Sequence, residues 1–113
     1  MNSLRFIGLG ILSSLLACAA PGQGRKARQG YAQAESIIVG LDGYREDNGQ
    51  YPGRLVDLVP KYIPIVPMSA QGKDFQYIGN GDSYMLSFVY TGPGLNHCTY
   101  PSQRRAWTCG GMF

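Results

Sequence analysis

Charged side chains are scarce in this sequence, and so is histidine. Asp, Glu, Lys and Arg make up 15% of the 113 residues, and one histidine is present. The net charge of +3 is too small and too scattered to indicate a nucleic-acid-binding protein, so we expect no nucleic-acid partner. A chain of this length has room for one small domain, which excludes a multidomain enzyme.

The residue types of catalytic and metal sites are equally few. The single histidine, His97, leaves no Ser-His-Asp set to propose, and one histidine with two cysteines supplies too few ligands for zinc. His97 precedes Cys98, but adjacent residues of a strand point to opposite faces, so His97 is poorly placed to activate that thiol. The acidic residues Asp42, Glu46 and Asp47 are read as a solvated helix face, with weak cation binding as the alternative. We therefore expect no enzyme activity, cofactor, metal or small-molecule substrate.

No apolar run is long enough to cross a membrane, although a shorter one stands near the N-terminus. A membrane-spanning helix needs roughly 20 apolar residues, whereas the apolar run here covers only residues 6–17. A start with one positive charge, a short apolar core and a small residue before a cleavage point are typical of a secretory signal peptide. We expect residues 1–17 to be such a signal.

The end of this segment, LLAC at residues 15–18, resembles the lipobox of bacterial lipoproteins. In that family the cysteine is acylated and becomes the first residue after cleavage, so the resemblance implies lipidation of Cys18 and a stable membrane anchor. Ala19 after the cysteine is similar to the outer-membrane sorting pattern of enterobacterial lipoproteins. The resemblance therefore implies a protein of the cell envelope, held at the outer membrane and facing the periplasm. The alternative is an ordinary secreted protein that is cleaved slightly later.

A tether and one globular domain are expected to follow the signal. Residues 18–26 comprise the lipidated cysteine and a small, Pro/Gly-rich segment that predicts a flexible tether, and residues 27–113 form the domain. Arg25, Lys26 and Arg28 stand where the tether meets the domain. They either solubilise the chain or contact anionic lipid head groups, near which the anchor would hold them.

The first half of the domain has a helical pattern. Apolar side chains recur at steps of three and four between residues 27 and 47, which predicts a long helix ending at Asn48-Gly49. Glycines within this helix lower its intrinsic stability, so it should depend on packing. A short helical piece over residues 54–59 and a proline-rich connector over residues 63–67 follow.

The second half of the domain has the alternating pattern of strands. Tyr84, Leu86, Phe88 and Tyr90 share one face of the best-defined strand. The fold class predicted is α+β, a long N-terminal helix packed on a small antiparallel sheet of three or four strands. The strands are expected over residues 75–78, 83–90, 95–100 and 106–110.

Cys98 and Cys109 remain once Cys18 is assigned to the lipid. Both lie in the expected last hairpin, and an exported domain meets an oxidising compartment, so we expect them to form a disulfide. Closing a loop of about 12 residues stabilises a domain by about 3 kcal/mol in the loop-entropy model.

A second resemblance covers residues 34–64. There an amphipathic helix is followed by the turn DNGQYP (residues 47–52), a Leu-rich short helix and a connector ending in YIP (residues 62–64). This order resembles the type IV pilins and the pseudopilins of type II secretion, the major pseudopilins in particular, and implies a pilin-like domain. The chain departs from that family because it lacks the long membrane-spanning helix, the processing site with Phe and Glu, and the calcium-ligand pattern. Filament assembly is therefore not implied.

Together, the two resemblances imply a lipid-anchored, non-enzymatic envelope protein. Its pilin-like domain would act as an accessory or protein-binding module of a secretion or pilus-like system; the alternative is a small inhibitor or immunity lipoprotein against an envelope hydrolase or toxin. The expected partners are the membrane, through the lipid, and another envelope protein. Tyr and Arg are enriched in binding hot spots, so the expected contact residues are Tyr100, Arg104, Arg105 and Trp107. Alternatively, the aromatic members simply pack the last hairpin.

Overall fold

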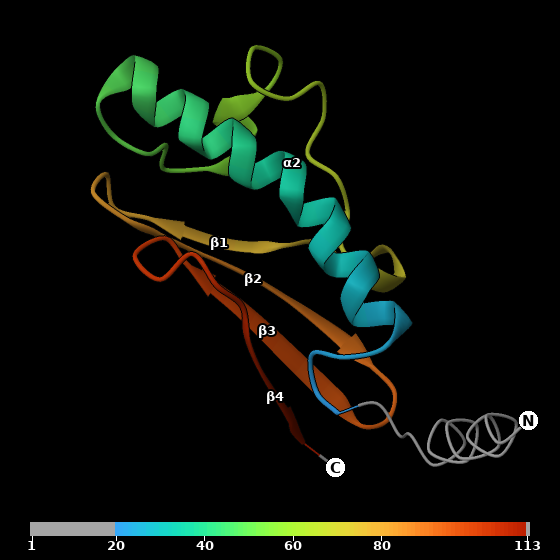
Figure 1. Cartoon of the computed structure of the whole chain (residues 1–113). Helices are drawn as coiled ribbons and strands as arrows, with labels where there is room; N and C mark the ends of the chain where they lie inside the picture. The colour runs from blue at the N-terminus through green and yellow to red at the C-terminus, as the bar shows by residue number, and fades with distance from the viewer. Residues whose placement is uncertain (1–19, 113) are drawn as a thin grey trace, which may run out of the picture.

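One helix packs on one face of a four-stranded antiparallel sheet (Figure 1). The computed structural model describes residues 20–112, so the expected signal peptide and Cys18 lie outside the described residues. The helix, α2, covers Arg25–Asn48. The α+β class predicted from the sequence is confirmed. No helix between residues 20 and 112 is both long and apolar enough to span a bilayer.

The four strands follow the chain order, and each is antiparallel to the next. Their bounds lie within two residues of those expected from the alternating pattern. β2 and β3 are central, and β1 and β4 form the edges. The strands are β1 (Gln76–Gly79), β2 (Tyr84–Thr91), β3 (Leu95–Pro101) and β4 (Thr108–Met112). The connector holds two 3-10 turns, η2 (Leu55–Leu58), where a short helix is expected, and η3 (Ala70–Gly72).

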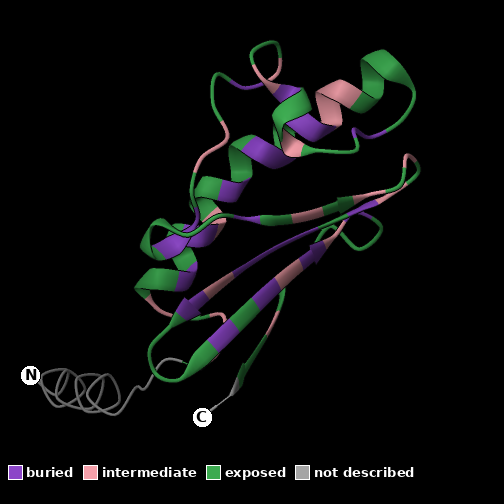
Figure 2. Cartoon of the chain, turned by 180° about the vertical axis from the view of Figure 1, so that it is seen from behind, coloured by how far each residue is buried: buried purple, intermediate pink, exposed green. Residues whose placement is uncertain are grey.

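The core lies between α2 and the face of β2 that the helix covers. The residues that the alternating pattern places on one face of β2 are all buried, and so is the apolar stripe of the helix (Figure 2). Gly30 stands where the helix approaches the sheet most tightly, because a β-carbon there would overlap the Phe88 ring. The missing side chain thus allows the contact on which the helix depends. The buried residues of the two elements are Ala27, Gly30, Ala34, Ile37, Ile38, Gly40 and Leu41 of α2 and Tyr84, Leu86, Ser87, Phe88 and Tyr90 of β2.

The turn after α2 ties the helix to the first hairpin. Gly49 ends the helix in the left-handed conformation (φ 79°), and its N–H donates to the Arg45 carbonyl at 2.8 Å. The N–H of Tyr51 then donates to the carbonyl of Gly81 in the β1–β2 turn at 2.8 Å. The Tyr77 hydroxyl donates to the Pro52 carbonyl at 2.7 Å. The residues of the DNGQYP segment therefore have a structural role at the junction of helix and sheet.

The disulfide between Cys98 and Cys109 is present, as the sequence predicts. The two residues are directly opposite each other on β3 and β4, with their Cα atoms 4.1 Å apart. Cys98 is fully buried, whereas His97 is exposed. The side chains of these neighbours therefore point to opposite faces, as expected for adjacent residues of a strand.

The segment before α2 differs from the flexible tether expected over residues 18–26. Gly22 donates its N–H to the Tyr90 hydroxyl at 2.9 Å, and its carbonyl accepts from the Tyr31 hydroxyl at 2.8 Å. A β-carbon on Gly22, whose φ is 85°, would lie 2.8 Å from the Cys109 sulfur. The described part of this segment is therefore packed against the disulfide end of the sheet, and the helix begins at Arg25, two residues before the expected start of the domain.

Candidate functional site

The structure separates the four residues that the sequence predicts as a partner-binding set. Tyr100 is buried, and the half-buried Trp107 places its ring 5.2 Å, centroid to centroid, from each of Tyr31, Phe88 and Tyr100. Such distances are typical of aromatic packing within a core. Tyr100 and Trp107 therefore pack the last hairpin against α2, which is the alternative that the sequence leaves open.

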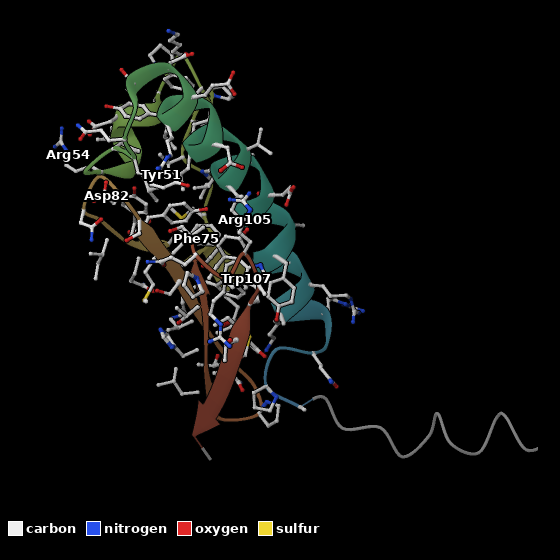
Figure 3. All side chains as sticks on the ribbon, turned by 60° about the vertical axis from the view of Figure 1, so that its left-hand side comes forward. Tyr51, Arg54, Phe75, Asp82, Arg105 and Trp107 are labelled. Atoms are coloured by element: carbon white, nitrogen blue, oxygen red, sulfur yellow. A yellow bond between two sulfur atoms is a disulfide. The ribbon has the colours of Figure 1, made fainter. Side chains whose placement is uncertain are left out.

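Arg105 lies in the β3–β4 turn and is bonded to the helix (Figure 3). Its guanidinium donates to both carboxylate oxygens of Asp42, at 2.7 and 3.2 Å. These hydrogen bonds raise the pKa of Arg105 above its usual value, so it stays charged at any pH at which the protein folds. The guanidinium is already paired within the domain, which makes Arg105 a poor contact residue.

Arg104 is exposed, as Arg105 is, but differs from it in its contacts. Its side chain forms no hydrogen bond or ion pair with residues 20–112, although its backbone N–H donates to the Pro101 carbonyl. Of the four expected contact residues, Arg104 alone therefore presents an unpaired cation at the tip of the β3–β4 turn.

Two acidic residues of α2, Asp42 and Asp47, have basic or hydroxyl partners. Asp42 is paired with Arg105, and Asp47 accepts from the Tyr62 hydroxyl at 2.8 Å and lies 3.5 Å from the Lys61 ammonium. Within the described chain, no three His, Cys, Asp or Glu side chains cluster as metal ligands would. These contacts support the solvated-face interpretation of the acidic residues over cation binding.

The only histidine stands on the open face of the sheet. His97 Nδ1 lies 3.5 Å from the Thr99 hydroxyl, and no carboxylate among residues 20–112 bonds to the ring. A catalytic nucleophile and its base have two further requirements, a third group that orients the base and a site that is sheltered from water. The His97–Thr99 contact has neither, so it is not a catalytic pair.

The four strands carry no charged side chain, a feature that the sequence analysis missed. Every Asp, Glu, Lys and Arg of residues 20–112 lies on α2, in the connector or in a turn. On the face of the sheet away from α2, Ile78 lies opposite Met85, and the two are 73% and 44% exposed. At the other end of this face Leu95 is 47% exposed. We call this surface the uncharged face. The feature of the sequence that could have revealed it is the absence of charged residues from all four strand segments.

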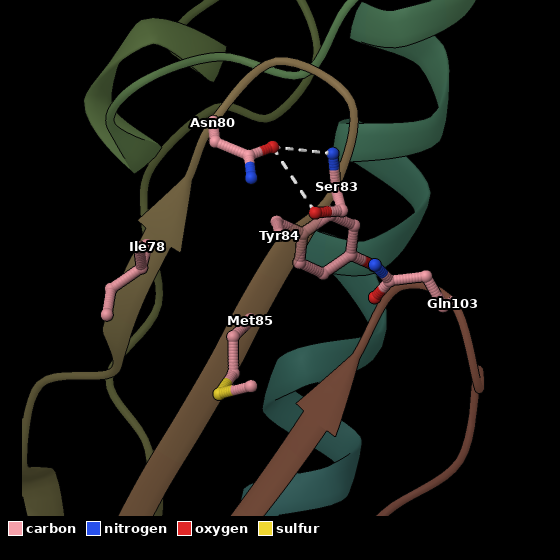
Figure 4. Close-up of a pocket in the computed structure, with 6 residues that line it drawn as sticks. All are labelled: Ile78, Asn80, Ser83, Tyr84, Met85 and Gln103. Atoms are coloured by element: carbon pink, nitrogen blue, oxygen red, sulfur yellow. Dashed lines mark hydrogen bonds between the residues drawn. The ribbon is translucent and has the colours of Figure 1, made fainter.

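Two shallow hollows lie on the uncharged face. The first, of about 240 Å³, lies beside the β1–β2 turn (Figure 4) and is lined by Ile78, Asn80, Ser83, Tyr84, Met85 and Gln103. Asn80 supports its rim because its side-chain oxygen accepts from the Ser83 N–H at 2.9 Å. The second hollow, of about 230 Å³, is lined by Leu95, His97, Gly110 and Gly111.

Neither hollow is lined by an Asp, Glu, Lys or Arg side chain, which makes the uncharged face suited to apolar or neutral groups of a partner. The chain matches no protein-family model, no curated protein and no solved structure.

Proposed function

We propose that this chain is a lipid-anchored, non-enzymatic protein of the bacterial cell envelope that binds another envelope protein. The acylated Cys18 is the anchor, which holds the protein at the outer membrane so that it faces the periplasm. The binding module is the α+β domain, which we propose to be pilin-like. The uncharged face of the sheet is the observation that carries the binding part of this proposal.

The absence of charge from the strands supports a protein partner. Proteins usually carry charged side chains, lysine above all, on exposed sheet faces and edges, because these charges prevent association with other chains. Here both edge strands and the sheet face between them lack charged side chains, while Ile78, Met85 and Leu95 are exposed. The core of a protein–protein interface is depleted in charge in the same way. The occupant we propose is a folded envelope protein that presents an uncharged, apolar surface.

The junction of helix and sheet supports the pilin-like part of the proposal. Helix, left-handed glycine, Tyr-Pro turn, short helical turn, connector and antiparallel sheet follow one another in the order that the resemblance implies. Tyr51 and Tyr77 hold that turn on the first hairpin by their hydrogen bonds to Gly81 and Pro52. An accessory role in a secretion or pilus-like system is the specific form that we propose.

The test is crosslinking in intact cells with charge introduced on the uncharged face. Ile78→Lys and Met85→Lys, separately and together, should weaken capture of the partner by about tenfold or more, because an unpaired ammonium would be buried in the interface. Val39→Lys is the matched control, because Val39 is also exposed (60%) but lies on α2. The Val39→Lys protein should capture the partner as efficiently as the unaltered protein does. Undiminished capture by the Ile78→Lys/Met85→Lys protein, with a normal melting temperature, would show that the partner binds elsewhere.

A further inference from the structure

Three basic residues surround the first turn of α2, where a helix usually carries acidic ones. Arg25, Lys26 and Arg28 stand there, and the first turn holds no Asp or Glu. The N-cap residue is Gly24, and no side chain of residues 20–112 caps the backbone N–H groups. Cations beside the positive end of a helix dipole repel it, so this arrangement opposes folding. An external anion would be attracted both by the side chains and by the open helix terminus.

The positive charge at this end of the domain is not balanced by acids of the same helix. The first acidic residue of α2 is Glu35, which is ten residues and therefore about 15 Å along the helix axis from Arg25. The remaining acids of the helix lie near its other end. Lys26 is also held at this end of the sheet, because its ammonium donates to the Thr91 carbonyl at 2.7 Å. We call Arg25, Lys26, Arg28 and this open first turn the basic end.

The chain enters the domain at the basic end. Gly22 is fixed there by its hydrogen bonds to Tyr90 and Tyr31. Gly22 is four positions after Cys18 in the sequence, and four residue steps span at most about 14 Å whatever their conformation. An acyl anchor on Cys18 therefore keeps Gly22, where the chain enters the basic end, within about 14 Å of the attachment point.

We propose that the basic end binds the anionic phosphodiester head groups of the membrane that holds the acyl anchor. This inference rests on the proposed lipid anchor and adds to it a defined orientation. The helix rises away from the bilayer from its N-terminal end, and the turn after Asn48 lies farthest from the lipid. The uncharged face then stands roughly upright from the membrane, open to a partner in the periplasm.

The test uses Trp107, the only tryptophan of the chain, as a natural energy donor. The protein, purified in the form that the cells produce, is mixed with vesicles that contain a dansyl-labelled lipid, with phosphatidylglycerol in one set and phosphatidylcholine alone in the other. Energy transfer from Trp107 should be higher on the phosphatidylglycerol vesicles. In about 0.5 M salt, where the screening length is roughly 4 Å, it should fall to the value found on neutral vesicles.

The variants compare equal charge changes at opposite ends of the domain. Arg25→Gln/Lys26→Gln/Arg28→Gln should abolish the salt-sensitive part of the transfer, because three basic residues shift the ratio of docked to undocked protein by roughly 100-fold. The control, Arg54→Gln/Lys61→Gln/Arg104→Gln, removes the same charge from residues far from the basic end. It should keep the salt-sensitive part of the energy transfer. Transfer that is the same on both kinds of vesicle, or that is lost equally in both variants, overturns the proposed orientation.

A separate reading of the same samples tests the anchor. Flotation of the protein with phosphatidylcholine vesicles depends on the acyl chains and not on the basic end. A protein that floats with neutral vesicles but shows no salt-sensitive transfer has the anchor without the orientation, which refutes this inference alone. A protein that does not float with neutral vesicles lacks the anchor, which refutes the proposed function and the inference with it.

Discussion

The guanidinium of Arg105 joins the β3–β4 turn to the C-terminal part of α2 through both carboxylate oxygens of Asp42. Arg105 adopts a left-handed backbone conformation (φ 51°), which is unusual for a residue other than glycine. The two hydrogen bonds hold the turn in place despite that conformation. An arginine that looks from the sequence like a contact residue therefore stabilises the domain instead.

Arg105→Ala should lower stability, whereas Arg104→Ala should not. The Arg105–Asp42 pair is about half-exposed, so its loss should cost roughly 0.5–1 kcal/mol, although the geometry is bidentate. For a domain of this size that corresponds to a drop in melting temperature of about 2–8 °C. Arg104→Ala, the neighbouring control, should melt within about one degree of the unaltered protein, as expected for a surface substitution. Equal melting temperatures for both variants would contradict the role given to the Arg105–Asp42 pair.

Gly30→Ala should destabilise the domain although alanine is the better helix former. Alanine gains about 1 kcal/mol of helix propensity over glycine. Its β-carbon would overlap the Phe88 ring, which is fully buried between α2 and the sheet, and overpacking of this kind costs about 1–3 kcal/mol or more. The net result should be a lower midpoint of denaturant unfolding.

Gly43→Ala is the matched control on the same helix. A β-carbon at Gly43 would lie 3.3 Å from the half-buried Tyr62 ring, which can shift by the few tenths of an ångström required. The propensity gain should then prevail, so that Gly43→Ala is neutral or stabilising by up to about 1 kcal/mol. A Gly30→Ala protein as stable as Gly43→Ala would contradict the close packing of helix on sheet.

Removal of the disulfide should cost about 3 kcal/mol, the loop-entropy value for two cysteines 11 residues apart. The pairing of Cys98 with Cys109 closes the β3–β4 hairpin and supports the packed segment at Gly22. The Cys98→Ala/Cys109→Ala protein should therefore unfold at lower denaturant concentration, and adding a reductant should not destabilise it further. A reductant should destabilise the unaltered protein by a similar amount, and a stable reduced protein would contradict this account.

Local patterns were enough to predict α2 and the four strands, although not the 3-10 turn η3. The alternation of Tyr84, Leu86, Phe88 and Tyr90 identified the buried face of β2, because strand geometry alone fixes it. The contacts that decide the candidate site are long-range. Asp42 and Arg105 are separated by 63 residues, and Gly22 and Tyr90 by 68. A Pro/Gly-rich segment has the same composition whether it is free or packed, so the sequence could not reveal that Gly22 is fixed.

The uncharged face could have been found from the sequence, but only with the strand bounds in hand. Charged residues are so scarce in this chain that their absence from any single strand does not stand out. Only all four strands together show it, and the ranges expected from the sequence, 75–78, 83–90, 95–100 and 106–110, already hold no Asp, Glu, Lys or Arg. Its exposure depends further on which face α2 covers, which is a property of the packed domain.

Stability should fall as the pH rises from about 10 to about 12. Burial raises the pKa of Tyr77 from its ordinary value of 10.0 to about 12, with smaller contributions from Tyr51 and Asp57. The folded protein therefore keeps the Tyr77 proton at pH values where the unfolded chain has lost it. Its contribution to stability is fully present below pH 10 and is lost as the pH rises through about 12.

Tyr77→Phe separates this effect from general alkaline unfolding. The variant should be about 1 kcal/mol less stable at neutral pH, because the Pro52 carbonyl loses the Tyr77 hydroxyl as its donor. Between pH 10 and 12 its stability should fall less steeply than that of the unaltered protein. Burial also raises the pKa values of Tyr31, Tyr84 and Tyr100, so a residual slope is expected. Identical slopes for the two proteins would show that Tyr77 titrates normally.

Cys18→Ser should abolish acylation and leave an uncleaved precursor in the membrane fraction. The lipobox reading makes the Cys18 thiol the acyl acceptor, and processing depends on the acylated cysteine. Labelling of growing cells with a radioactive fatty acid, followed by gel electrophoresis, measures both effects. The control is the Cys98→Ala/Cys109→Ala protein, which should still be labelled because its cysteines are those of the disulfide. Labelling that persists in Cys18→Ser would refute the anchor and, with it, the orientation that the fixed Gly22 gives the domain.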